Sequence, residues 1–152
     1  MKRSILFLCT ANAIRSQMAK GWLEHLSSDF IAYSAGILPN GQVDDLAVEV
    51  MRDVGIDIAS YRSQEIETLR HTPIDILITM SSTAYRECPS WLYSQPNLIS
   101  GHWGFEDVSG KSKSRYRRLR DEIGAHICAF LAAYHPEQSP SEVAALVRKL
   151  MR

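Results

Sequence analysis

A short apolar run, Ile5–Leu8, is followed within a few residues by an amphipathic stretch, and this order constrains the fold more than any other feature. The run predicts a buried parallel strand, and the periodicity that begins near Arg15 predicts a helix. Cys9, five residues, Arg15 and Ser16 lie at the junction. Such a turn aims successive backbone N–H groups and a helix N-terminus at one point, which makes a site for an anion.

The side chains of this turn are suited to attack on a tetrahedral oxyanion. The positive field of the turn stabilises a thiolate, so Cys9 is a candidate nucleophile. Arg15 offers a planar fork of donors that matches the oxyanion. The alternative is a small buried cysteine at a strand end, followed by a surface arginine in the first helical turn. The positions of Ser16 and of the helix start favour the oxyanion site.

Apolar runs of strand length alternate with stretches of helical periodicity along the rest of the chain. Strands are expected at residues 2–8, 30–34, 74–80 and 97–100, and helices at 15–27, 44–54 and 112–134. This order predicts an α/β fold, a doubly wound four-stranded parallel sheet with helices on both faces. Trp22 and Cys128 are expected in the core, whereas the proline-containing segment 82–96 is expected to lack long regular structure.

The last segment predicts one more helix, over residues 139–151. Ser139 and Glu142 have the spacing of a capping box, and Pro140 stands at the first helical position. An apolar face follows at helical spacing, formed by Val143, Leu146, Val147 and Leu150. We expect this helix to pack on its own domain, and we treat residues 1–152 as one domain.

Composition argues against several classes of function. Seventeen basic and seventeen acidic residues give a formal net charge of zero, so no overall field favours nucleic acid or a membrane surface. Three cysteines without a framework spacing favour a reducing compartment over a disulfide scaffold. The apolar run near the start is too short for a signal peptide or a membrane span. We therefore expect a cytoplasmic protein without nucleic-acid or membrane partners, metal or cofactor.

Several segments together resemble the low-molecular-weight protein tyrosine phosphatases, and more closely their thioredoxin-coupled arsenate reductase relatives; these are residues 9–16, 17–22, 34–36, 55–58 and 102–107. The resemblance extends to about Tyr134. It implies that Cys9 is the nucleophile, that Arg15 clamps the oxyanion and that Asp107 is the general acid. It also implies that the substrate sits on the loop residues Thr10, Ala11, Asn12, Ala13, Ile14 and Ser16, with Asn12 holding the loop and Ser16 stabilising the thiolate.

The chain departs from the family pattern at the thiols. Cys88 matches the later resolving cysteine of the reductases, but Ser81 stands where the earlier one is found, so the usual three-cysteine relay is broken. Val108 follows Asp107 where the family usually has proline. A turn aspartate is the alternative interpretation of Asp107.

The loop and the first helix depart as well. Ala11 replaces a glycine, so we expect strain from an alanine in a positive-φ conformation. Ala13 replaces a small polar residue and Ile14 a second cysteine, and Lys20 stands where the reductases often have glutamate. A cation site beside Lys20 is therefore not expected.

Three functions remain open. The first is hydrolysis of phosphomonoesters through a phosphocysteine, for which Cys9, Arg15 and Asp107 suffice. The second is arsenate reduction by Cys9 and Cys88 with an external thiol, for which thioredoxin, glutaredoxin and a small thiol are the candidate donors. The third is a weakly active oxyanion-binding regulatory module, suggested by the altered loop. The expected ligand is phosphate, arsenate or a phosphomonoester.

Overall fold

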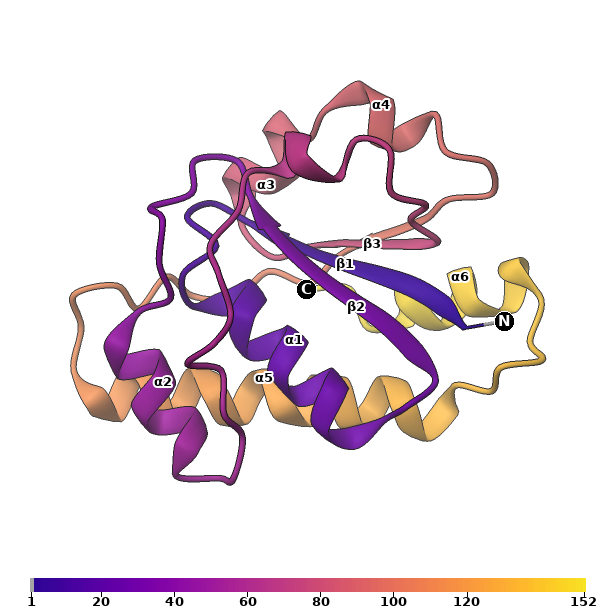
Figure 1. Ribbon diagram of the computed structural model, residues 1–152. Helices are drawn as coiled ribbons and strands as arrows, with labels where there is room; N and C mark the ends of the chain where they lie inside the picture. Colours follow the sequence, from indigo (N-terminus) through magenta and orange to yellow (C-terminus); the bar gives the residue numbers. More distant parts are fainter. Residues whose placement is uncertain (1) are drawn as a thin grey trace.

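A four-stranded parallel sheet forms the centre of the computed structural model, which describes residues 2–152 (Figure 1). Its strands, in the order β2-β1-β3-β4, are β1 (Arg3–Cys9), β2 (Phe30–Gly36), β3 (Ile76–Thr79) and β4 (Ile99–His102). All three pairings are parallel, so the strand ends that carry Cys9 and Gly36 lie side by side. The predicted fold class is confirmed, and β4 is an edge strand.

Helices cover both faces of this sheet. One face packs against α1 (Arg15–Leu26), α2 (Asp45–Arg52) and α5 (Lys113–Ala133), and the other against α3 (Ser82–Glu87) and α4 (Ser90–Tyr93) (Figure 1). A single turn of 3-10 helix spans Ile66–Leu69. The sheet therefore separates two apolar clusters, and the segment predicted to lack long regular structure forms only the short helices α3 and α4.

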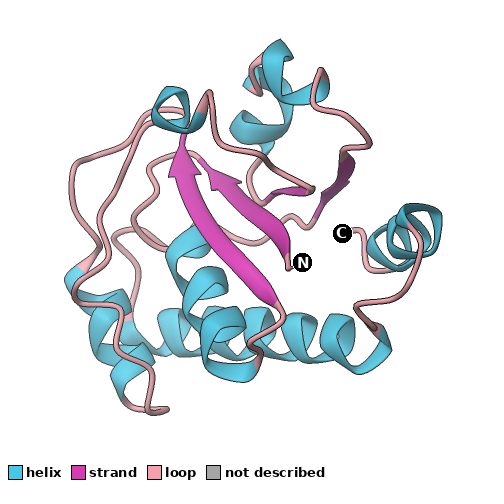
Figure 2. Ribbon diagram, turned by 45° about the vertical axis from the view of Figure 1, so that its right-hand side comes forward, coloured by secondary structure: helices cyan, strands magenta, loops and turns pink. Residues whose placement is uncertain are grey.

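Local sequence signals set several helix ends. Asp44 caps α2 by accepting hydrogen bonds from the N–H groups of Leu46 and Ala47, at 2.9 and 3.2 Å. Gly55 follows α2 with a φ of 82°, a conformation that continues no helix. The predicted last helix is α6 (Pro140–Lys149), and Ser139 and Glu142 form the predicted capping box. It lies at the β4 side of the sheet, on its own domain (Figure 2).

One core prediction is wrong. Cys128 is exposed on α5. The buried stripe of that helix passes through Ile123, Ile127 and Phe130, and Cys128 lies one residue beyond Ile127, about 100° around the helix axis. Trp22 does pack against the core, where its indole N–H donates to the Arg120 carbonyl at 3.0 Å. None of the described helices has the length and apolar character needed to cross a bilayer.

Candidate active site

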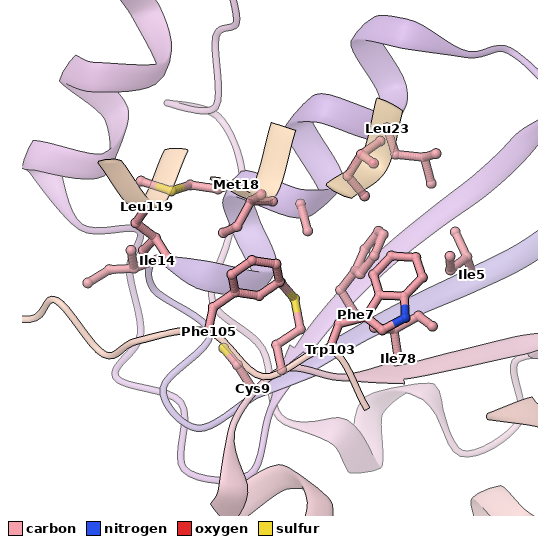
Figure 3. Packing of buried hydrophobic residues seen from close by; sticks show 14 of the residues in the cluster. Ile5, Phe7, Cys9, Ile14, Met18, Leu23, Ile78, Trp103, Phe105 and Leu119 are labelled. Atoms are coloured by element: carbon pink, nitrogen blue, oxygen red, sulfur yellow. The ribbon is translucent and has the colours of Figure 1, made fainter. Parts of the chain in front are cut away.

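Cys9 ends β1 and lies at the edge of the larger apolar cluster, which also contains Ile14 and Phe105 (Figure 3). Its side chain is 2% exposed, and its Sγ lies 2.9 Å from the Oγ of Ser16 in the first turn of α1. The Asn12 side-chain amide donates to the same Oγ at 2.7 Å. Because that amide already occupies an Oγ lone pair, the Ser16 hydroxyl hydrogen can point at the sulfur, which stabilises a Cys9 thiolate.

The backbone conformation of the loop is held at Asn12. This residue has a φ of 53°, and asparagine tolerates the left-handed region better than most side chains. Its Oδ1 accepts a hydrogen bond from the Gln64 N–H at 2.8 Å. The expectation that Ala11 adopts a positive φ is wrong, since the left-handed residue is the next one along the chain. Replacement of the family glycine by Ala11 therefore costs no backbone strain of that kind.

A fully buried amide behind the loop was not identified from the sequence. The side-chain nitrogen of Gln17 donates to the Asn12 carbonyl and to the Arg62 carbonyl, each at 3.0 Å, and its oxygen accepts from the Ser34 hydroxyl at 2.9 Å. Gln17 thus satisfies the backbone carbonyl of the left-handed loop residue at a position buried from solvent. The available signal was a glutamine one residue after Ser16, on the buried side of α1.

Gly36 allows β2 to approach the loop closely. A Cβ built at this position would lie 2.7 Å from the Thr10 carbonyl oxygen, 2.9 Å from the Asn12 Cβ and 3.0 Å from the Asn12 nitrogen. Two of these atoms belong to the backbone and cannot rotate away. The loop therefore packs directly against the end of β2, and the lack of a side chain at Gly36 permits this short distance between them.

The sulfur faces a small cavity of about 110 Å³. Its lining includes the predicted residues Cys9, Thr10, Ala11, Ala13, Ile14, Arg15 and Asp107, together with Asn40, Asp44 and Ser109. The structure therefore brings the three predicted catalytic residues to one space. Asn12 and Ser16 are fully buried behind the lining, so they support the loop and do not line the cavity.

Arg15 and Asp107, two polar residues of the cavity lining, are each held by a hydrogen bond. The Arg15 Nη1 donates to the Phe105 carbonyl at 3.1 Å, which ties the guanidinium to the segment before Asp107. Asp107 is exposed, and its Oδ1 accepts from the Ser109 N–H at 3.0 Å. Val108, in place of the family proline, is 1% exposed and anchors this segment in the core. Asp107 is thus both a turn aspartate and a cavity-lining carboxylate.

Asp44 is a second carboxylate of the cavity that the sequence did not reveal as a site residue. Beyond capping α2, its Oδ2 accepts a hydrogen bond from the Tyr116 hydroxyl at 3.1 Å. Burial, with the nearby Asp44 charge, raises the pKa of Tyr116 to about 12, so the phenol remains a donor at neutral pH. Asp44 also donates its backbone N–H to the Ala13 carbonyl at 3.0 Å, which links α2 to the loop.

Cys88 does not line the cavity. It caps the C-terminal end of α3, where burial raises the pKa of its thiol. The other end of α3 adjoins the loop, because the Thr10 hydroxyl donates to Ser81 Oγ at 3.0 Å and Ser81 in turn accepts from the Ala84 N–H. The six residues of α3 separate the Cys9 loop from Cys88 by about 9 Å of helix rise.

The Lys20 ammonium lies over the Tyr61 ring, 4.2 Å from its centroid. Among residues 2–152, no three His, Cys, Asp or Glu side chains are grouped as metal ligands.

Comparison with known proteins agrees with this geometry. Residues 4–140 match the family described as low molecular weight phosphotyrosine protein phosphatase. Arsenate reductase 2 of Staphylococcus saprophyticus is 43% identical over 130 residues, which cover 85% of this chain and 96% of that protein. An arsenate reductase of Bacillus cereus is 42% identical over 130 residues, covering 85% and 94%.

Solved structures with a similar fold include an arsenate reductase and a low molecular weight protein tyrosine phosphatase. An arsenate reductase in the phosphate binding state superposes with a TM-score of 0.74 at 28% identity, covering 86% of this chain and 97% of that one. A low molecular weight protein tyrosine phosphatase from T. tengcongensis has a TM-score of 0.72 at 24% identity, covering 88% and 100%, a likeness of fold. The chain is therefore an enzyme of the low molecular weight phosphotyrosine protein phosphatase family, which includes both phosphatases and arsenate reductases.

Proposed function

We propose that this enzyme reduces arsenate to arsenite, with Cys9 as nucleophile, Cys88 as resolving thiol and an external dithiol as electron donor. The identity of 43% to an arsenate reductase over most of both chains is the observation that carries the proposal. It reverses the order of the sequence-based hypotheses, in which phosphomonoester hydrolysis came first. Cys88, an unpaired thiol on the same side of the sheet as Ser81, supports it further.

The first step uses the groups that surround the cavity. Arsenate binds on the loop N–H groups and the Arg15 guanidinium, and the Cys9 thiolate attacks arsenic. A sulfur–arsenic bond forms and one arsenate oxygen leaves as water after protonation. Arg15 and the loop stabilise the charge of the adduct, while the Ser16 hydroxyl holds the thiolate before attack.

The second step transfers two electrons to arsenic. The Cys88 thiolate attacks the Cys9 sulfur, the sulfur–arsenic bond breaks, and its electron pair reduces As(V) to arsenite. The product on the enzyme is a Cys9–Cys88 disulfide, which the external dithiol reduces by thiol exchange. Because α3 separates the two thiols, this step requires α3 to unwind, which also brings Cys88 into water and lowers its burial-raised pKa.

The decisive experiment compares thiol variants in a thioredoxin-coupled arsenate assay. Cys88→Ala is expected to lose turnover by about 1,000-fold or more, because an intramolecular thiol acts at a high effective concentration. Ser81→Cys is expected to raise turnover above wild type, since it places a thiol at the end of α3 that contacts Thr10. Cys128→Ala, which removes an exposed thiol on α5, is the matched control and is expected to behave as wild type.

Wild-type turnover by Cys88→Ala would refute the two-cysteine relay. Arsenate reduction absent from wild type and from Ser81→Cys alike would refute the proposed function.

A second activity, hydrolysis of phosphomonoesters, is supported by Asp107, which lines the same cavity as Cys9 and Arg15. As general acid, Asp107 would protonate the leaving group. Asp107→Asn is therefore expected to lose about 100- to 10,000-fold on phenyl phosphate and much less on a nitrophenyl ester, whose leaving group needs no proton. Phosphate release from both esters measures this, and an equal loss on both would assign Asp107 to the turn alone.

A further inference from the structure

Residues 140–152, here called the clasp, pack against β4 and the segment that follows it. All but the first of these residues lie beyond the part of the chain that matches the family. Val147 is fully buried over Gly101 of β4, where a Cβ would lie only 2.4 Å from the Val147 Cγ1. The Trp103 indole N–H donates to the Val147 carbonyl at 3.3 Å. The clasp is therefore fitted to this edge of the sheet.

The end of the clasp reaches the segment before Asp107. The Arg152 N–H donates to the His102 carbonyl at 3.0 Å, and the Arg152 guanidinium carbon lies 4.2 Å from the centroid of the Phe105 ring. Glu122 of α5 holds the same guanidinium at 3.5 Å. Arg152 thus covers one side of the Phe105 ring, with its backbone held by His102 and its guanidinium by Glu122.

His126 of α5 supports the same ring from another side. Its Nε2 lies 2.6 Å from the Leu150 carbonyl, so the ring donates to the clasp. It also meets Phe105 and Trp103 edge to face, with ring centroids 5.6 and 4.7 Å away. Phe105 is 7% exposed, so neither its ring nor its backbone can shift without moving these neighbours.

The Phe105 carbonyl accepts the hydrogen bond from Arg15 at 3.1 Å, and Phe105 therefore joins the clasp to the cavity. We propose that the clasp positions the Arg15 guanidinium for oxyanion binding, acting through the contact of Arg152 with Phe105. Arg152 is a positioning residue, because it does not line the cavity. This inference rests on the proposed function only in taking Arg15 as the oxyanion-binding side chain.

The test measures binding of inorganic phosphate to the full chain, by the protection it gives Cys9 against iodoacetamide. Arg152→Ala is expected to weaken phosphate binding by up to about tenfold, because the energy of a partly exposed cation–π contact is the most that this contact can transmit to Arg15. The alkylation rate without phosphate should stay at the wild-type value. Arg152→Lys, which keeps the cation, should restore part of the affinity, and Lys149→Ala, which removes an exposed cation at the end of α6 in the same clasp, should change nothing.

A compensating pair tests the clasp independently of Arg152. Gly101→Ala is expected to displace Val147 and to weaken phosphate binding to a similar extent. Adding Val147→Ala removes the methyl that the new Cβ would meet and should restore the affinity, a non-additivity that assigns the effect to the contact between Gly101 and Val147. Thermal unfolding of each variant is followed in parallel.

The two possible failures are distinguishable. Phosphate that protects wild type and all variants equally would overturn the positioning role while leaving the oxyanion site intact. Phosphate that gives no protection in wild type would overturn the site itself and the positioning role with it.

Discussion

Cys9→Ser is expected to abolish arsenate turnover, by about 10,000-fold or more, while the protein stays folded and binds phosphate. The sulfur both forms the bond to arsenic and later accepts the attack of Cys88, so a hydroxyl can replace it in neither step. Serine is small enough for the 2% exposed site and can keep a hydrogen bond to Ser16. Coupled arsenate turnover measures the loss, and calorimetry with inorganic phosphate measures the retained binding.

Cys128→Ser is the matched control for this prediction. It makes the same chemical change at an exposed thiol on α5 and should leave turnover unaltered. Arsenate turnover by Cys9→Ser within tenfold of wild type would contradict the assignment of Cys9 as nucleophile. Loss of phosphate binding together with turnover would show instead that the sulfur is needed to keep the loop in shape.

Gly36→Ala is expected to disable the site although Gly36 is not one of the residues that line the cavity. The new Cβ would meet the Thr10 carbonyl oxygen at 2.7 Å and the Asn12 nitrogen at 3.0 Å, so the loop must move off β2. A displacement of about 1 Å is enough to cost about 100-fold in rate. The overpacking should also lower the free energy of unfolding by about 1–3 kcal/mol. Turnover and chemical denaturation measure the two effects.

Gly55→Ala separates the loop effect from general destabilisation. Gly55 has a φ of 82° and nothing within 4 Å of a built Cβ, so alanine there introduces strain without a contact. We expect a stability loss of about 1 kcal/mol and unchanged turnover. If Gly36→Ala lost no more turnover than Gly55→Ala, the close approach of β2 would not control the loop.

The sequence by itself determined the features that arise from neighbours along the chain. An apolar run followed by a periodic stretch placed Cys9 and Arg15 at a strand-to-helix turn, and alternation of such runs fixed the parallel α/β fold. The Ser139 capping box and the glycine after α2 marked helix ends, because these signals act within one or two turns of the backbone. The resemblance also grouped Asp107 with Cys9 and Arg15, and the three line one cavity.

Tertiary structure alone decided how the loop is supported and what else faces it. The positive φ falls on Asn12 instead of Ala11, and the side chain of Asn12 is held there by the N–H of Gln64, 52 residues along the chain. Asp44 enters the cavity because α2 packs against α5, where Tyr116 holds its carboxylate.

The contacts of Arg15 and Phe105 also join segments that lie far apart in the sequence, so local sequence signals could not predict them. Arg15 meets the Phe105 carbonyl across a separation of 90 residues, and the clasp reaches Phe105 because α6 packs against β4. Periodicity on α5 could not tell the buried stripe from Cys128 beside it, since the position of the neighbouring elements sets which edge of an apolar face is covered. Helix caps and apolar periodicity depend on the residues of one segment, so the sequence reveals them. The contacts of Arg15 and of the clasp with Phe105 depend on which distant segments the packed core brings together.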